Sequence, residues 1–261
     1  MDSTLNILAI AIMVGASSGT IGSFVLLRRM ALVGDALSHV ALPGIALALA
    51  YHVDPFWGVV SFLIPAAALV WWLEARTQLH PETLVGLLFT TSLAVGILTI
   101  PDVEILESLF GGFPKLSTTT LISIFITATI LILFTFLAAQ RFALATVASE
   151  LCAPRIRRSS DLLLLLIFAM IVSLGIKLVG TLMMGALTII PASIGRNSAF
   201  SFKQYVVAST AAGAAMAAFG AMAAHRFGWP PGPTIVLLGS ALFVVSLAFS
   251  RVVRPLLKSG L

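Results

Sequence analysis

The sequence predicts an all-α membrane protein, a polytopic bundle of eight or nine transmembrane helices that forms a single transmembrane domain over residues 1–261. Composition is the first observation behind this prediction: 59% of the residues are hydrophobic and 10% are charged, whereas a soluble domain is about 25% charged. The second is the mean hydropathy of +1.11, which indicates that much of the chain faces lipid. The third is the arrangement of the apolar residues in long runs, with no hydrophilic stretch long enough to fold separately.

The expected spans are uncharged apolar stretches close to the ~17–25 residues that a helix needs to cross a bilayer. They lie at residues 5–27, 32–51, 55–73, 83–100, 118–139, 162–176, 178–195, 205–224 and 232–250. We expect helices because these runs are apolar all round, whereas the strands of a barrel alternate every second residue. Only Lys177 and Gly180 interrupt the chain between residues 162 and 195, so one broken helix is an alternative to two spans there.

The Lys and Arg residues predict the orientation in the membrane. With the N-terminus outside and nine spans, 12 of the 15 basic residues fall in inner loops or at the C-terminus. Cytoplasmic loops are enriched in Lys and Arg, so we expect the C-terminus in the cytoplasm. The net charge of +5 is likewise explained by basic residues in the cytoplasmic loops. Nucleic-acid binding is not expected, because no run of basic residues is interleaved with aromatic ones.

Several catalytic motifs are absent from the sequence. It has no G-x-x-x-x-G-K-[ST] loop for ATP phosphates, no G-x-S-x-G elbow and no H-E-x-x-H pair. A single cysteine, Cys152, excludes an internal disulfide and a cysteine-cluster metal site. We therefore expect a transporter subunit rather than an enzyme, with the energy for active transport supplied by another subunit or by an ion gradient.

The segment 34–39 is the main candidate for a functional site. Asp35 and His39 are four residues apart, so on a helix they share one face, one turn from each other. A carboxylate and an imidazole can bind a divalent transition metal, and because two ligands do not close a site, transient occupancy is expected. Pro43 and Gly44 follow, where the backbone is expected to open locally. A structural alternative is that Asp35 caps the helix and His39 hydrogen-bonds to it.

Other polar residues are weaker candidates. His52, His80 and His225 fall in loops or at the end of a span, where solvated or interfacial histidines are the ordinary case. The loop 101–117 is expected outside, either as an ordinary polar loop or as a docking surface near the mouth of a pore.

Four motifs resemble the membrane permeases of zinc, manganese and iron ABC importers. Residues 22–39 read GSFVLLRRMALVGDALSH, residues 109–111 read LFG, residues 179–192 read VGTLMMGALTIIPA, and residues 231–237 read PGPTIVL. The first motif is specific, and the others are apolar and less so. The resemblance runs from about residue 15 to residue 250, in order and with compatible spacing, and the zinc-uptake permeases look closest.

The resemblance implies a fold of the ABC importer permease type in a bacterial inner or plasma membrane. The cargo would be Zn²⁺, Mn²⁺ or Fe²⁺, moved inward through one pore at the interface of a homodimer, with no permanently bound cofactor. A cytoplasmic ABC ATPase subunit would bind the inner face, and an extracytoplasmic metal-binding protein would deliver the ion. Asp35 and His39 would be the residues that contact the metal.

One inner segment departs from the family pattern. These permeases usually carry an acidic residue, an alanine and a glycine in the cytoplasmic coupling segment, whereas residues 145–154 read ATVASELCAP here. We expect residues 142–156 to form a short cytoplasmic helix that docks on the ATPase, through residues that differ from the family's.

Two other classes of protein remain as alternatives. A secondary ion-coupled transporter of small solutes or cations is disfavoured because the membrane segments hold no further pair of charged residues. A membrane enzyme that uses Asp35 and His39 as an acid–base pair is disfavoured because no nucleophile or third metal ligand accompanies them. Co-purification of the chain with an ATPase would indicate an ABC permease, and purification without one would favour a secondary transporter or a membrane enzyme.

Overall fold

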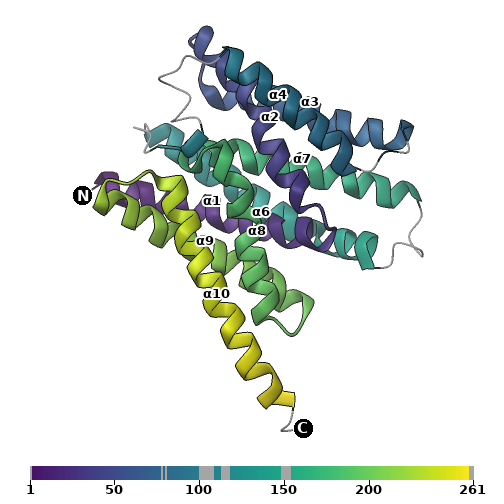
Figure 1. Ribbon diagram of the computed structural model, residues 1–261, viewed down its shortest axis with the longest axis vertical. Helices are drawn as coiled ribbons and strands as arrows, with labels where there is room; N and C mark the ends of the chain where they lie inside the picture. The colour runs from purple at the N-terminus through teal and green to yellow at the C-terminus, as the bar shows by residue number, and fades with distance from the viewer. Residues whose placement is uncertain are drawn as a thin grey trace.

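The computed structural model describes residues 2–77, 79, 81–99, 109–112, 118–147 and 154–258, without the side chains of some helical residues, among them Asp35 and Lys177. All long elements within these ranges are helices (Figure 1). They are α1 (Asp2–Leu27), α2 (Ala31–Ala50), α3 (Pro55–Arg76), α4 (Pro81–Thr99), α6 (Thr118–Val147), α7 (Pro154–Val179), α8 (Thr181–Ser198), α9 (Phe202–Phe227) and α10 (Pro231–Lys258). The predicted all-α polytopic class is confirmed.

The number of spans is smaller than predicted. Within the described residues, six helices are long and apolar enough to cross a membrane by themselves: α1, α3, α6, α7, α9 and α10. The described side chains of α2 and α4 cover shorter apolar stretches, Ala36–Ala50 and Thr83–Gly96. By the length and composition of the described residues, the count of six is below the eight or nine spans predicted.

The chain between α7 and α8 breaks at one residue. Gly180 has a φ of 80°, in the left-handed region that glycine adopts at little cost. The run of α-helical backbone hydrogen bonds of α7 ends at this residue. Figure 1 shows α8 crossing the direction of α7 beyond this point. The structure has two helices here, α7 and α8, with Lys177 inside α7, but of the two only α7 is among the helices that could cross a membrane by themselves.

The interior of the bundle is built from small residues on α1, α8 and α9. A Cβ added to Gly15 would lie 2.2 Å from the carbonyl oxygen of Gly213, and one added to Gly19 would lie 2.2 Å from that of Ser209. Gly22 makes the same kind of approach to the carbonyl of Thr188. In membranes such residues let helix backbones touch and gain dispersion energy along their length. Consequently α1 is the most enclosed candidate span, with 72% of its apolar window buried.

The outer helices have the opposite character. Only 17% of the apolar window of α6 and 22% of that of α10 are buried. Large apolar side chains such as Leu137 and Val244 are more than half exposed. Side chains of this kind need an apolar solvent, so these faces of α6 and α10 are expected to meet lipid or a second membrane chain.

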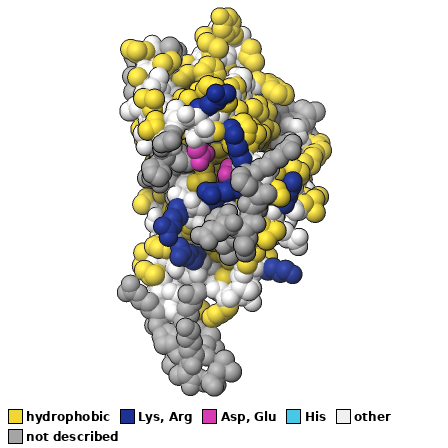
Figure 2. Space-filling model, turned by 90° about the vertical axis from the view of Figure 1, so that its right-hand side faces the viewer, with side chains coloured by type: hydrophobic (Ala, Val, Ile, Leu, Met, Phe, Trp, Pro, Cys, Tyr) yellow, Lys and Arg dark blue, Asp and Glu magenta, His cyan; other side chains and the backbone are white. Residues whose placement is uncertain are grey.

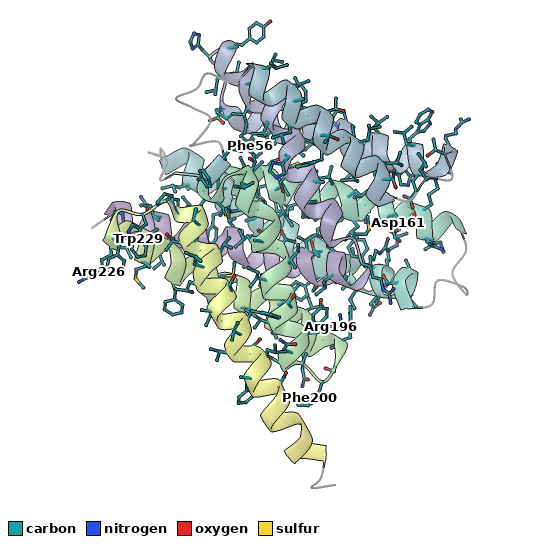
Figure 3. All side chains as sticks on the ribbon, in the orientation of Figure 1. Phe56, Asp161, Arg196, Phe200, Arg226 and Trp229 are labelled. Atoms are coloured by element: carbon teal, nitrogen blue, oxygen red, sulfur yellow. The ribbon has the colours of Figure 1, made fainter. Side chains whose placement is uncertain are left out.

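The basic side chains gather at one end of the bundle. Figure 2 looks at this end, where α1 and α3 finish and α7 begins, and shows Lys and Arg side chains spread across it. Figure 3 places Asp161 and Arg196 toward this end and Arg226 and Trp229 at the opposite one. We call the first the basic end. The bundle therefore has the charge asymmetry that a membrane orientation requires.

Candidate functional site

Helix α2 carries the predicted pair and lies between α3, α4 and α8. All side chains from residue 37 to residue 46 are buried, so this part of α2 is enclosed on every side. His39 is 4% exposed, and its imidazole meets the ring of Phe89 on α4 edge-on, with the centroids 4.8 Å apart and the planes at 74°. Asp35 lies one turn earlier in the same helix. The structure thus confirms the helical spacing of the pair.

The capping alternative for Asp35 is wrong. Helix α2 begins at Ala31, and its N-cap is Met30, which makes no side-chain capping hydrogen bond. Asp35 lies in the second turn, beyond the first-turn backbone N–H groups that a cap satisfies. Capping of this helix therefore gives no reason for a carboxylate at position 35.

The proline predicted to open the backbone lies inside α2. Pro43 has no N–H to donate to the carbonyl oxygen four residues earlier, which belongs to His39. Gly44 follows and packs against Gly58 of α3, where an added Cβ would lie 2.4 Å from the Gly58 carbonyl oxygen. Backbone contact with α3 therefore holds one side of α2, while the imidazole faces a side chain of α4.

The other histidines lie apart from this pair. His52 is exposed in the turn after α2, with a φ of 53°, and His225 is exposed in the last turn of α9. His80 lies outside the described residues. Within the described part of the chain, no group of three or more His, Cys, Asp or Glu side chains is placed so that it could hold a metal ion. The candidate site thus remains a pair on one helix.

Three of the family motifs meet at one point, a contact that the sequence did not predict. Cβ atoms added to Gly111 and Gly180 would lie 2.3 Å from the carbonyl oxygen of Leu178 and 2.2 Å from that of Leu109. One added to Gly232, at the start of α10, would lie 2.2 Å from the Val179 carbonyl oxygen. The LFG, VGT and PGP segments are therefore joined backbone to backbone, which accounts for glycine in each.

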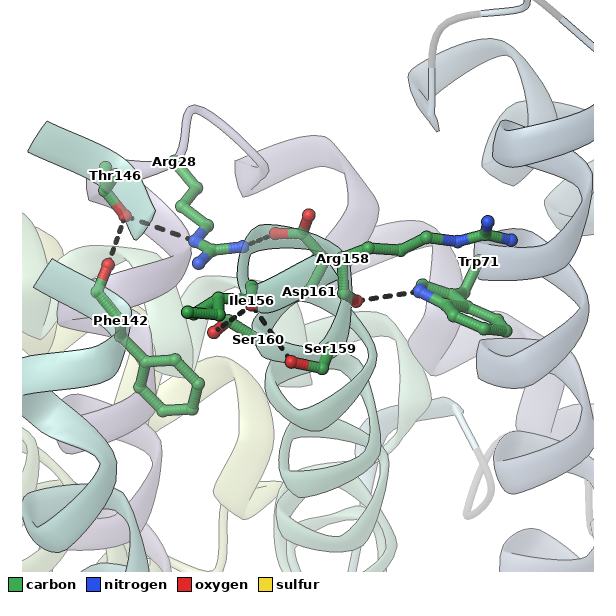
Figure 4. A network of polar contacts seen from close by, with 9 residues as sticks. All are labelled: Arg28, Trp71, Phe142, Thr146, Ile156, Arg158, Ser159, Ser160 and Asp161. Carbon is green, nitrogen blue, oxygen red and sulfur yellow. Dashed lines mark hydrogen bonds and ion pairs between the residues drawn. The ribbon is translucent and has the colours of Figure 1, made fainter. Parts of the chain in front are cut away.

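The basic end holds an ion pair that the sequence also did not reveal. Arg28, at the end of α1, pairs with Asp161 of α7, and its Nε–H donates to the hydroxyl of Thr146 on α6 at 3.2 Å (Figure 4). Arg28 is 7% exposed and Asp161 is 23% exposed. The ion pair and this hydrogen bond join the end of α1 to α6 and α7, which follow it much later in the chain.

The predicted coupling helix over 142–156 lies in the same region. Its first residues, to Val147, are the last turns of α6, and its last residues, from Pro154, begin α7. The prediction of a separate helix is therefore wrong at both ends. Residues 148–153, which hold most of the atypical segment, lie outside the described residues.

Comparisons with known proteins agree with the four motifs. A family model described as the ABC 3 transport family matches residues 1–250. The zinc uptake membrane protein ZnuB of Haemophilus influenzae is 32% identical over 243 residues, which are 87% of this chain and 90% of that protein. The manganese import permease ScaB of Streptococcus gordonii is 28% identical over 249 residues, 92% of this chain and 89% of that protein. A structure of PsaBC from Streptococcus pneumoniae in complex with Fab superimposes with a TM-score of 0.80 and 26% identity, covering 93% of this chain and 90% of that one.

Proposed function

Because the chain belongs to the ABC 3 transport family, we propose that it is the membrane permease of an importer whose cargo is a divalent transition metal ion, zinc or manganese, with ferrous iron as a further candidate. Relatives that match nearly the whole chain are named for zinc uptake and for manganese import, which supports this cargo. The chain itself is a transporter subunit and not an enzyme. The family also removes the secondary carrier and the membrane enzyme as alternatives.

Asp35 and His39 contact the metal during its passage. The observation that carries this assignment is the enclosure of His39 in the middle of an apolar bundle, one helical turn from a carboxylate. Ionisable residues are costly in a membrane, so each needs a function or a partner that offsets the cost. Imidazole nitrogen and carboxylate oxygen are ligands that zinc and manganese accept. Two ligands bind weakly, and an importer must release its ion.

Access to His39 requires movement of the side chains around it. In this protomer the imidazole is covered by Phe89, so an ion reaches it only when that contact opens. The pore lies at the interface of a homodimer, and α2 and α4 change their spacing so that the pair becomes exposed to it. At His39 and Phe89 the two helices meet through side chains, which permits such a change there more easily than backbone contact would.

The partners and the orientation follow from the family and the charge pattern. The basic end faces the cytoplasm, because positive residues are retained on that side. The C-terminus faces the cytoplasm as well. A cytoplasmic ABC ATPase binds this end and hydrolyses ATP. An extracytoplasmic protein delivers the metal at the opposite end, where Gly111, Gly180 and Gly232 join three segments.

Transport by the reconstituted complex tests this function. The permease and its ATPase are placed in proteoliposomes with ATP on the ATPase side, and uptake of ⁶⁵Zn²⁺ or ⁵⁴Mn²⁺ is measured with the delivery protein present. We expect uptake that requires ATP and survives a protonophore. Uptake that continues without ATP but collapses with the proton gradient would contradict an ABC mechanism. A complex that is active with ATP but takes up neither zinc nor manganese would contradict the proposed cargo.

A further inference from the structure

A groove lies between α3 and α7 at the basic end. It has a volume of about 510 Å³ and is lined by Trp71 of α3 and by Arg158, Ser159, Leu162, Leu163 and Leu166 of α7. Residues 158, 162 and 166 are spaced by four, so they follow one another along one face of α7. The lining therefore changes from a cation and a hydroxyl in the first turns of α7 to leucines farther along the helix.

The cation of this groove is held in place. The guanidinium of Arg158 lies 4.5 Å from the centre of the Trp71 ring, and the indole N–H of Trp71 donates to the carbonyl oxygen of Arg158 at 2.8 Å. Figure 4 shows the Arg158 side chain extending over the indole, away from Asp161. A guanidinium that is already stacked on a ring loses less conformational entropy when it binds an anion than a mobile one does. The N–H groups at its edge still point outward.

The surroundings of Arg158 favour an anionic partner. Arg157 is exposed beside it, and Arg76 lies 5.5 Å from the ring of Trp72, on the last turns of α3. The acidic residue on this part of α3 is Glu74, which is half-buried. Within the described part of the chain, no carboxylate lies at ion-pair distance from Arg158, and Asp161 is engaged by Arg28. Among the described side chains of these turns, three arginines and one half-buried glutamate favour an anion at the mouth of the groove.

We propose that this groove binds an anionic phospholipid, with its phosphate against Arg158 and an acyl chain along the leucines of α7. Indole rings collect at the boundary between headgroups and hydrocarbon, where Trp71 and Trp72 would place the phosphate at the correct depth. A soluble phosphate would gain nothing from the leucines that line the groove. A zwitterionic headgroup would bring its own positive charge toward the arginines, which disfavours it. The proposal depends on the chain being a membrane protein and is independent of the metal it carries.

Native mass spectrometry of the detergent-purified complex tests the proposal. Phosphatidylglycerol and phosphatidylcholine are offered at equal concentration, and sn-glycerol 3-phosphate is added in a separate arm. Arg158→Gln removes the cation, and Leu166→Trp fills the apolar part of the groove. The matched control is Arg141→Gln, which removes an exposed arginine on the last turns of α6, outside the groove.

We expect the wild type to retain phosphatidylglycerol in preference to phosphatidylcholine. Arg158→Gln should reduce that retention about fivefold, the effect of about one basic residue on an anionic headgroup. Leu166→Trp should reduce retention with no change of charge, and Arg141→Gln should not change it. If Arg158→Gln fails to assemble, Leu166→Trp decides the question alone.

Four results would overturn the proposal. Equal retention of the two lipids would show that the groove does not select the headgroup charge. Equal losses in Arg158→Gln and Arg141→Gln would show that only the overall surface charge matters. Displacement of the lipid by sn-glycerol 3-phosphate would assign the groove to a soluble phosphate. Loss of the ATPase from Arg158→Gln with unchanged lipid retention would assign it to the protein partner.

Discussion

Helices α1, α8 and α9 meet through their backbones, whereas the imidazole on α2 meets α4 through a side chain. Gly15 and Gly213 are so close that neither can carry a Cβ without a shift of the backbone. His39 and Phe89 are held by an edge-to-face contact at 4.8 Å, which a change of rotamer would open. Backbone contact fixes the spacing of two helices, and side-chain contact leaves it adjustable. His39, one residue of the candidate metal pair, meets α4 through a contact of the adjustable kind.

The predictions below follow this difference, from the largest expected effect on the amount of folded protein to the smallest. Substitutions in the backbone-packed part should reduce that amount. Substitutions around His39 should leave it nearly constant and change transport by each folded molecule.

Gly213→Leu should have the largest effect. Four carbons cannot fit where a single one would lie 2.1 Å from the Gly15 carbonyl oxygen, so α1 and α9 must separate, at a cost of about 3 kcal/mol or more. The measurement is the yield of monodisperse protein by size-exclusion chromatography in detergent. The control is Gly86→Leu on α4, because a Cβ at Gly86 meets no atom within 4 Å. Equal yields from the two variants would show that the helix contact is not tight.

Asp161→Ala should have the next largest effect. It leaves the nearly buried guanidinium of Arg28 without its carboxylate, at a cost of about 2–4 kcal/mol, less than for a fully buried pair because Asp161 is 23% exposed. The free energy of unfolding in a detergent titration reports the change. Glu74→Ala, at a half-buried site without an ion pair among the described residues, should cost no more than about 1 kcal/mol. Combining Asp161→Leu with Arg28→Met should restore much of the lost stability, and no recovery would argue against the pair.

Phe89→Ala should have a small effect on folding and a clear one on transport. Phe89 is half-buried, so its truncation removes modest packing but uncovers the imidazole of His39. We expect the metal concentration for half-maximal uptake to change several-fold at nearly constant protein yield. Phe125→Ala, at an exposed phenylalanine of α6, serves as the control for loss of an aromatic ring. An unchanged concentration dependence in Phe89→Ala would separate the ring contact from the metal path.

The fold class could be predicted from the sequence because hydropathy is a local property. Each apolar run encodes its own helix, so most boundaries lie within a few residues of those expected, and Gly180 was recognised as an interruption. The burial of α2 among its neighbours could not be predicted, because it depends on tertiary packing. No local pattern reports which helices will surround another.

The candidate pair could be predicted, but its surroundings could not. Asp35 and His39 are spaced by one helical turn, and that spacing is visible in the sequence. The contact of Phe89 with His39 and the ion pair of Arg28 with Asp161 each join segments that are far apart in the chain. The sequence around a phenylalanine or an arginine does not indicate which distant residue it will contact. The start of α2 at Ala31, which removed the capping alternative, follows from the turn after α1 and not from the residue types around Asp35.

Uptake by Asp35→Asn and His39→Gln tests the metal assignment most directly. Asn keeps the size of Asp and loses its charge, and Gln keeps hydrogen bonding and loses the imidazole ligand. Both variants should assemble with the ATPase in normal amounts, because each replacement keeps a polar side chain of similar size. We expect each to reduce ATP-driven uptake of ⁶⁵Zn²⁺ or ⁵⁴Mn²⁺ to background. Normal uptake by both variants, at normal protein levels, would contradict the assignment and leave the pair with a structural role in α2.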